Sequence, residues 1–241
     1  MMVSGIWLPK CLRSARKIDR ISYEEMLELA SLGAKVLQIR SVEVAMKYGV
    51  PVHVRSSFSE EEGTMVVREE DLESVTVAGV AYDKNEAKVQ MVRVPDRPGI
   101  VAALFAKLAE ENVSVDMIIQ SPSWGHDGHT DVTFTVPKLD LARVRRLIEA
   151  EAQILGAQQV DFDSEIVKVS IVGLGMRSHA GVAARMFELL AAENINIQAI
   201  STSEIKISCV IASEHTELAV RTLHDGFGLD KVGASVPPPA P

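Results

Sequence analysis

The feature that most constrains the fold is a segment that occurs twice in the chain. Residues 88–120 read KVQMVRVPDRPGIVAALFAKLAEENVSVDMIIQ, and residues 168–202 read KVSIVGLGMRSHAGVAARMFELLAAENINIQAIST. Gly99 of the first copy corresponds to Gly181 of the second, an offset of 82, whereas the opening lysines are offset by 80 (168 − 88). The turn in the second copy is therefore two residues longer. A repeat of this size predicts two homologous modules.

Each copy has the pattern of a strand, a turn, a helix and a second strand. In the first copy Ile100, Leu104 and Leu108 recur at helical spacing after a β-branched run, so one face of the helix must be buried. Pro98 suits the first turn of a helix, and Gly99 lets backbone or a ligand approach closely. Because the first N–H groups of a helix are free and the helix dipole is positive there, such a turn can bind a small anion such as a carboxylate.

The residues that follow each copy predict how the two modules are completed. In the first copy a strand, a helix and a strand come next and close a βαββαβ module (131–136, 141–150 and 159–163). In the second copy a strand at 205–211 and a helix at 214–224 follow, but the Gly- and Pro-rich tail supplies no last strand. The strand predicted at 75–82 has no module of its own. We therefore expect this strand to complete the second module, so that the first module is inserted within the second.

The amino-terminal part predicts a small fragment of mixed helices and strands. Ser22 and Glu25 have the spacing of a capping box, which predicts a helix start, and Gly33 ends that helix. A strand, a second helix, a β run and a polar connector are expected to follow (36–39, 42–48, 51–55 and 56–73). This βαβ-like fragment is too small to hold a nucleotide-binding core of its own.

Composition limits the class of protein and its partners. A chain of 241 residues that is 47% hydrophobic can bury substantial cores and favours two or more domains. Its net charge of −8 argues against a nucleic-acid partner, because phosphates require a basic face. No apolar run approaches the length of a membrane span, so no membrane partner is expected. With only Cys11 and Cys209, a disulfide framework is not indicated, and a reducing cytoplasm is the expected location.

Several motifs together resemble one protein family. They are KIDRISYEEMLELASLGAKVLQIRSVEVAMKYGVPVHVRSSF at 17–58, VAGVAYDKNEAKV at 77–89, and PDRPG, GHTDVTFT, GMRSHAGVAARMF and ISTSEIKIS in the two copies. From about residue 15 to residue 231 the chain resembles the regulatory region of aspartate kinase, a β-type regulatory subunit or the carboxyl-terminal portion. The resemblance implies an α+β fold with two ferredoxin-like βαββαβ ACT modules, the first inserted in the second. A remnant of the carboxyl-terminal end of an α/β amino-acid kinase domain would precede them.

The resemblance also implies a division of the chain into domains. The opening residues have no basic region before their apolar residues, so a signal peptide is not indicated and an irregular leader is expected. The expected parts are the leader (1–14), the kinase remnant (15–58), a linker (59–73), the first ACT domain (85–165), the second ACT domain (74–84 plus 166–232) and a disordered tail (233–241).

The chain departs from the family in its amino-terminal part. The KFGGTS-type motif and most contacts to ATP and aspartate in that family have no counterpart here, so the resemblance implies no catalytic residues and no cofactor in this chain. ATP and Mg²⁺ would belong to the intact kinase. The chain would then be inactive alone, either as a β-type regulatory subunit that can pair with a full-length α chain or as a fragment of a longer kinase. The alternatives are an active aspartate kinase that phosphorylates L-aspartate with ATP, and a free-standing ACT regulator, which would leave residues 17–58 unexplained.

The resemblance places an effector site at the first module's turn. ACT modules of that family pair between subunits into an eight-stranded sheet and bind lysine or threonine, which inhibit the first step of lysine, threonine and methionine biosynthesis. The implied site lies where the modules of a homodimer meet. Asp96 would bind the ammonium group of the amino acid, and Gln120 would bind its side chain. The backbone beside Pro98, at Gly99, Ile100 and Val101, would bind the carboxylate. The partner subunit's Asn196 and the partner subunit's Ile197 would close the pocket. The alternative is that Asp96 only caps the helix and Gln120 is a solvated strand residue.

Three further groups of residues have competing interpretations. The second module's turn could form a second effector site or part of the interface through Met176, Ser178 and His179. The pair Gly173 and Gly175 follows a strand, but the glycine spacing is wrong for a dinucleotide-binding turn. A cluster of His126, His129 and Asp131 offers metal-like ligands, but no cysteine or second histidine pair completes a set, so no metal is expected.

Overall fold

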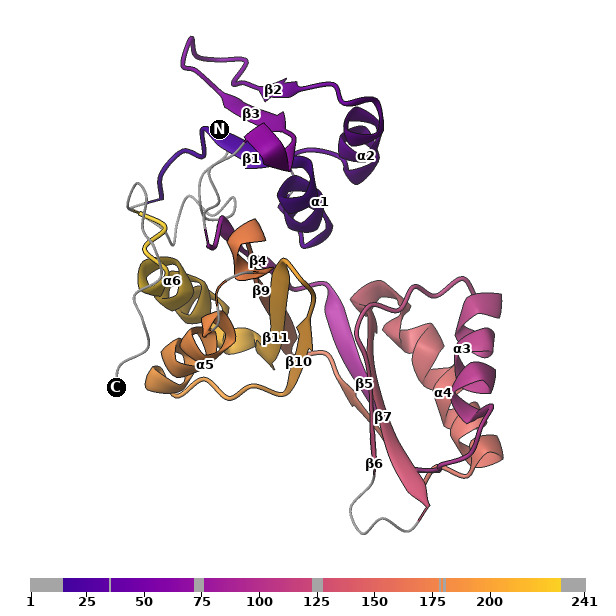
Figure 1. Ribbon diagram of the computed structural model, residues 1–241. Coiled ribbons are helices and arrows are strands. Elements are labelled where there is room, and N and C mark those ends of the chain that lie inside the picture. The colour runs from indigo at the N-terminus through magenta and orange to yellow at the C-terminus, as the bar shows by residue number, and fades with distance from the viewer. Residues whose placement is uncertain are drawn as a thin grey trace. The chain divides into compact units, whose positions relative to one another are not determined.

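The structure is a computed structural model that describes residues 15–34, 36–71, 76–122, 128–177, 179 and 181–230 (Figure 1). The chain divides into two compact units, one formed by residues 1–83 with 167–241 and the other by residues 84–166. One unit is thus an insertion in the chain of the other, which confirms the predicted nesting. The predicted leader 1–14 and tail 233–241 lie outside the described residues.

The inserted unit is a complete βαββαβ module. Its strands are β5 (Glu86–Pro95), β6 (Ile118–Pro122), β7 (His129–Pro137) and β8 (Gln159–Asp163), and its helices are α3 (Ile100–Glu110) and α4 (Leu141–Leu155), with a short 3₁₀ turn η2 (Lys138–Asp140). The four strands pair antiparallel in the order β6-β7-β5-β8. Both helices cover one face of this sheet in Figure 1. The helix predicted at 141–150 runs on to Leu155, where Gly156 with a φ of +79° ends it.

The core of the inserted unit lies between its sheet and its two helices. Leu104 and Leu108 of α3 and Ile148 of α4 are fully buried against strand residues such as Phe134. Phe105 packs edge-on against Phe134, with ring centroids 5.4 Å apart. Because each fully buried large apolar side chain stabilises the fold by about 1.5–3 kcal/mol, this layer fixes where α3 begins and which residues stand at its head.

The second module is built from residues on both sides of the insertion. It contains β4 (Gly79–Asp83), β9 (Ile166–Val172), the 3₁₀ turn η3 (Leu174–Arg177), α5 (Val182–Ala192), β10 (Ala199–Thr202), β11 (Lys206–Ala212), the 3₁₀ turn η4 (Ser213–His215) and α6 (Thr216–Gly226). The strand order is β10-β11-β9-β4, and no strand follows β11 in the described chain as far as Asp230. Here β4 pairs antiparallel with β9, as β8 pairs with β5 in the inserted unit. The segment predicted at 75–82 therefore completes the second module, as expected.

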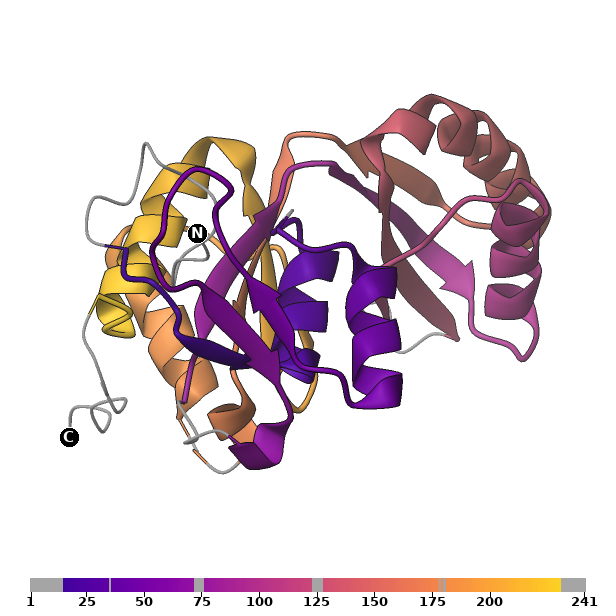
Figure 2. The same cartoon turned by 90° about the horizontal axis from the view of Figure 1, so that it is seen from above.

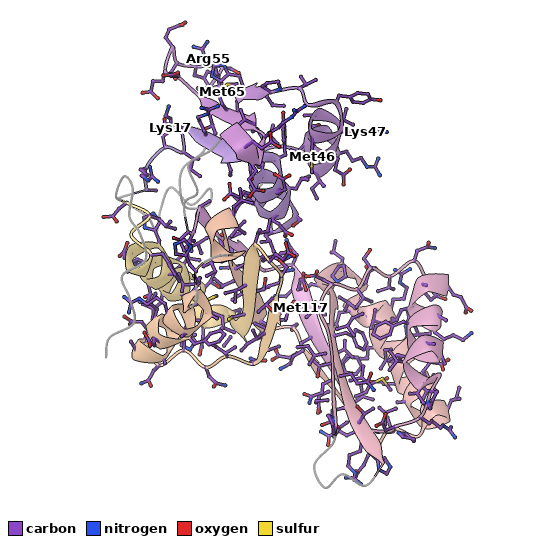
Figure 3. All side chains as sticks on the ribbon, in the orientation of Figure 1. Lys17, Met46, Lys47, Arg55, Met65 and Met117 are labelled. Atoms are coloured by element: carbon purple, nitrogen blue, oxygen red, sulfur yellow. The ribbon has the colours of Figure 1, made fainter. Side chains whose placement is uncertain are left out.

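The amino-terminal fragment forms a small sheet with two helices. Its elements are β1 (Arg20–Ser22), α1 (Tyr23–Ser31), α2 (Ile39–Tyr48), β2 (Val52–Val54), β3 (Thr64–Val67) and the 3₁₀ turn η1 (Glu69–Asp71). The sheet order is β1-β3-β2, with β1 parallel and β2 antiparallel to β3. The Lys17 ammonium group donates to the Glu62 carbonyl at 2.8 Å and so holds the loop between β2 and β3 (Figure 3 labels Lys17).

Two sequence predictions in this fragment were wrong. The strand expected at 36–39 does not form: the N–H of Val36 donates to the Ala34 carbonyl at 2.7 Å, and α2 already begins at Ile39. Turn hydrogen bonds therefore replace a strand ladder there. The connector expected at 56–73 contains β3, because the run Thr64–Val67 finds a partner strand on each side and is largely buried.

Helix α1 covers one face of the second module's sheet. Met26 and Leu29 of α1 share a buried cluster with Ala81 of β4 and Val172 of β9. Helices α5 and α6 lie side by side on the opposite face, as the orange and yellow helices of Figures 1 and 2 show. The amino-terminal fragment and the second module are therefore packed as one unit. Within the described residues no helix is long and apolar enough to cross a bilayer.

The thiol of Cys209 provides a check on the second module's core. Cys209 lies on β11 with none of its surface exposed, and this burial raises its pKa to about 12. Because the thiolate is the reactive form, we expect iodoacetamide at about pH 8 to leave Cys209 unmodified in the folded protein and to alkylate it fully in urea. Peptide mass spectrometry measures the extent at this residue. Rapid alkylation in native buffer would contradict the buried position.

Candidate effector-binding site

The head of α3 combines an exposed carboxylate with free helix amides. After β5, the N–H of Asp96 donates to the Gly128 carbonyl at 2.8 Å, which fixes the turn that leads to the helix. The Gly99 carbonyl accepts the first helical hydrogen bond, from Ala103 at 2.9 Å. The N–H of Ile100 makes a long hydrogen bond of 3.4 Å to the Arg97 carbonyl, and the N–H groups ahead of Ala103 have no carbonyl four residues back inside the helix, at the positive end of its dipole. This end of α3 can therefore bind an anionic group.

The conformation of Gly99 keeps the space over the helix head open. Gly99 is the N-cap residue with a φ of +96°, in the left-handed region that favours glycine. A Cβ added there would meet no heavy atom within 4 Å. Pro98 and the Asp96 side chain are exposed beside it, while Ile100 is buried and Val101 half-buried. The turn thus presents a carboxylate and N–H donors to the same open space.

The structure argues against a capping role for Asp96. The N-cap position of α3 is Gly99, and no described side chain makes a capping hydrogen bond to this helix. A capping carboxylate would have to accept from the amides of the first turn. The Asp96 side chain is therefore an exposed acid beside the helix start and makes no capping hydrogen bond to it.

Gln120 lies on an edge strand of the same unit. It is exposed on β6, opposite Val132 of β7. Ile118 precedes it by two residues on the same face of the strand and is 53% exposed, although it is apolar. Met117, labelled in Figure 3, is instead buried, and its N–H donates to the Thr135 hydroxyl at 3.2 Å. Strand β6 thus carries a polar and an apolar side chain on a face that its own unit leaves uncovered.

The corresponding edge of the second module carries the other predicted residues. Asn196 is exposed just before β10, and Ile197 is half-buried against the module's own core. Ile200 of β10, the counterpart of Ile118 at the offset of 82, is 41% exposed. Asn196 and Ile197 belong to a different unit from Asp96 and Gln120. The two modules therefore expose equivalent apolar positions on equivalent edge strands.

The second module's turn differs from the first in its contacts. The two extra residues are absorbed by η3, and the N–H of Leu174 donates to a carboxylate oxygen of Glu25 at 3.0 Å. Met176 is half-buried against the module's core, and His179 is exposed with its Nδ1 2.7 Å from the Gly175 carbonyl. Ser178 lies outside the described residues. The sequence signalled the capping box of Glu25 but not this long-range contact, which depends on the tertiary fold.

The residues of the metal-like cluster have structural roles where they are described. His126 lies outside the described residues. One carboxylate oxygen of Asp131 accepts from the N–H of Arg93 at 2.8 Å, at a register shift between β5 and β7 where Arg93 has a φ of +54°. In the part of the chain that the structure describes, no group of three or more His, Cys, Asp or Glu side chains is placed to hold a metal ion.

Comparison with known families identifies the three parts of the chain. Residues 91–153 and residues 169–227 each match a family described as the ACT domain. Residues 3–56 match the amino acid kinase family. The two ACT matches lie in the inserted module and in the second module, and the kinase match covers much of the amino-terminal fragment.

Relatives of the chain carry one name. An aspartate kinase of Pseudomonas fluorescens is 50% identical over 232 residues, which cover 95% of this chain and 56% of the relative. A chain from a structure of aspartokinase alpha and beta subunits is 47% identical, with 62% of this chain and 97% of that chain covered and a TM-score of 0.58. The regulatory subunit of aspartate kinase from Thermus thermophilus, in its ligand-free form, is 37% identical, with 64% and 99% covered and a TM-score of 0.59.

The family matches agree with the architecture of the described residues. The chain spans about half the length of the curated relatives it matches, and it covers nearly all of the two solved regulatory chains. The aspartate kinase of Pseudomonas fluorescens covers 95% of this chain, which holds both ACT matches and the kinase match. The chain therefore belongs to the aspartate kinase family and carries the tandem ACT regulatory portion of that family.

Proposed function

We propose that this chain is the allosteric regulatory portion of an aspartate kinase that binds threonine, lysine or both. In this proposal the bound amino acid inhibits the first step of the synthesis of lysine, threonine and methionine. The observation that carries the proposal is the head of α3, where the exposed residue Asp96 lies close in sequence to the first helix amides and a Cβ at Gly99 would meet no atom within 4 Å. Membership of the aspartate kinase family supplies the class of ligand.

The chemistry of this turn suits a free amino acid. A zwitterion needs an acid beside its ammonium group and N–H donors beside its carboxylate, and hydrogen bonds between charged groups are the strong ones. Asp96 serves the ammonium group, and the backbone from Gly99 to Val101 at the positive end of α3 serves the carboxylate. The amide of Gln120 on β6 is available to a hydroxyl or a second ammonium group, which is where threonine and lysine differ.

The exposed edges support a homodimer as the binding form. Within the described residues β6 hydrogen-bonds only to β7, and β10 only to β11, so these two strands are edge strands at matching positions of their sheets. Antiparallel pairing of β6 with the partner's β10 would join two four-stranded sheets into one of eight strands. It would also cover Ile118 and bring the partner subunit's Asn196 and the partner subunit's Ile197 toward the head of α3.

Regulation then follows from a difference in affinity between two dimer arrangements. A ligand shifts such an equilibrium only by the ratio of its affinities for the two states, typically ~1–3 kcal/mol of coupling. Because the kinase-derived fragment and the second module are packed as one unit, a rearrangement of that module reaches the fragment directly.

The catalytic part is proposed to belong to a full-length α chain. In this arrangement ATP, Mg²⁺ and aspartate bind to the α chain, and the present chain supplies no catalytic group. The match of residues 3–56 to the amino acid kinase family supports a kinase-derived fragment in this chain. An assay of the purified chain for ATP-dependent aspartyl phosphate tests the proposed arrangement directly. Activity without an α chain would establish the alternative, a complete aspartate kinase.

Substitution of Asp96 tests the proposed pocket. We expect Asp96→Ala to weaken binding of threonine or lysine by about 10- to 100-fold, because a charge-assisted contact to the ammonium group is lost. Isothermal titration calorimetry measures the affinity. Asp161→Ala is the matched control, because Asp161 is an exposed acid on β8, at the opposite edge of the same sheet. Unchanged binding by the Asp96 variant would remove this residue from the site, and no heat with either amino acid would contradict the function.

A further inference from the structure

Glu25 is a buried carboxylate that serves two segments far apart in the chain. It is 4% exposed, and its Oε2 accepts from the backbone N–H of Ser22 at 3.2 Å and from the Ser22 hydroxyl at 3.1 Å. Its Oε1 accepts from the backbone N–H of Leu174 at 3.0 Å, across 149 residues of sequence. The capping box needs only the first of these interactions. The second oxygen therefore has a separate partner in the second ACT module.

The hydrogen bond from Leu174 to Glu25 holds the turn before helix α5 of the second module. Leu174 opens η3, directly after β9 and before α5. This turn corresponds to the proposed effector turn of the first module, where the N–H of Asp96 instead bonds to the Gly128 carbonyl of its own module. The second module's turn is thus held by the kinase-derived fragment, whereas the first module's turn is held from within.

Neighbouring contacts make the link stiff. One helical turn after Glu25, the Glu28 carboxylate lies 2.8 Å from the Lys206 ammonium group at the start of β11. The N–H of Gly173 donates to the Ile205 carbonyl at 2.9 Å, so the same turn is also tied to the strand that Lys206 begins. A buried apolar cluster of α1, β4 and β9 surrounds these contacts. Interactions away from water are stronger than exposed ones, so a displacement on one side is passed to the other.

Helix α5 connects this turn to the edge proposed to meet a ligand. The turn leads into α5 at Val182, and α5 leads out to Asn196 and Ile197. A helix of three turns moves as a rigid body, so a shift at Asn196 is carried back to Leu174. From Leu174 the Glu25 carboxylate gives a direct hydrogen bond to α1.

We propose that Glu25 is the positioning residue that couples the second ACT module's turn to helix α1 of the kinase-derived fragment. This inference rests on the proposed regulatory function and deepens it, because it names the contact through which an occupied pocket acts on the kinase side. A carboxylate is required, since two different N–H donors approach its two oxygens. Glutamine has one carbonyl oxygen and one NH₂ group, so in Glu25→Gln one of the two donors faces another donor.

Two variants distinguish the contact between Glu25 and Leu174 from the capping of α1 by Ser22 and Glu25. In Glu25→Gln the capping box can persist, because it accepts glutamine at this position, while the contact to Leu174 is lost. In Ser22→Ala the cap hydroxyl is lost, but the backbone N–H of residue 22 and the Leu174 contact to Glu25 both remain. Ser22→Ala therefore weakens the start of α1 and leaves the Leu174 contact in place. Of the two, only Glu25→Gln removes the hydrogen bond from Leu174 to α1.

Hydrogen–deuterium exchange of the full chain tests the coupling. Without ligand, we expect Glu25→Gln to raise exchange at residues 173–177 by about tenfold or more, and Ser22→Ala to leave it within about twofold of wild type. With saturating L-threonine and L-lysine, exchange in α1 should change in wild type and in Ser22→Ala but not in Glu25→Gln.

Different results would overturn the coupling role of Glu25 and the proposed regulatory function. Equal exchange at 173–177 in the two variants, or an α1 response to the amino acids in Glu25→Gln as large as in wild type, would overturn the coupling role. Absence of calorimetric binding by the wild-type chain would contradict the proposed function, and the ligand-free comparison would still decide the link between Glu25 and Leu174.

Discussion

Replacing Gly173 with alanine is expected to lower the free energy of unfolding of the unit that contains the second module by about 3 kcal/mol, because a methyl group has no space there. A Cβ at this position would lie 2.4 Å from the Thr76 carbonyl oxygen, 2.7 Å from Cα of Val77 and 3.0 Å from the amide nitrogen of Ala78. All three are backbone atoms, which no change of side-chain rotamer can move. The segment from Thr76 to Ala78 would have to shift away from β9.

Urea denaturation monitored by circular dichroism measures this effect. Gly99→Ala is the control, because Gly99 also lies in the segment between the first strand and the first helix of an ACT module, but a Cβ added there would meet no atom within 4 Å. We expect that variant to lose only about 1 kcal/mol, from the positive φ alone. Equal losses in the two variants would show that the contact of Gly173 with residues 76–78 is not as close as described.

Substituting Ile118 with aspartate is expected to weaken dimerisation by about 100-fold or more. In the proposed dimer Ile118 is covered by the partner at the β6 edge, and an unpaired charge buried in an interface costs several kcal/mol, where ~2.7 kcal/mol corresponds to 100-fold. The change acts at two equivalent places in a symmetric dimer. Sedimentation velocity over a concentration series measures the dissociation constant.

A second exposed isoleucine provides the control for this substitution. Ile154 of α4 is 73% exposed in the same unit but does not lie on an edge strand. Ile154→Asp should therefore leave the dissociation constant within about twofold of wild type, since surface substitutions are usually small in effect. Dimerisation of Ile118→Asp with wild-type affinity, or equal loss in both variants, would show that β6 is not the dimer edge.

The nested architecture could be predicted because its signals are local and repeated. The duplicated strand, turn and helix gave the number of modules, and the Gly- and Pro-rich sequence after α6 predicted no last strand, so only the segment of β4 was available to complete the second sheet. The capping box at Ser22 and the glycine at the head of α3 were equally local. Each of these features depends on the spacing of residues close in sequence, which is what a sequence pattern records.

The features that the sequence did not reveal depend on contacts between distant residues. The sequence predicted residues 64–67 as part of a connector because their neighbours are polar. In the structure they form β3, which pairs with β1 on one side and with β2 on the other. The contact between Glu25 and Leu174 joins segments with no shared pattern. The exposure of Ile118 and Ile200 was also hidden, because an apolar residue in a strand is as consistent with a core as with an interface.

The most direct test of the account is a crystal structure of this chain grown with L-threonine and L-lysine. The account predicts two copies joined edge to edge through β6 and β10, with an amino acid over Gly99 whose ammonium group contacts Asp96 and whose carboxylate accepts from the amides at the head of α3. An empty helix head at saturating amino acid, or sheets of the two copies that share no edge, would contradict it.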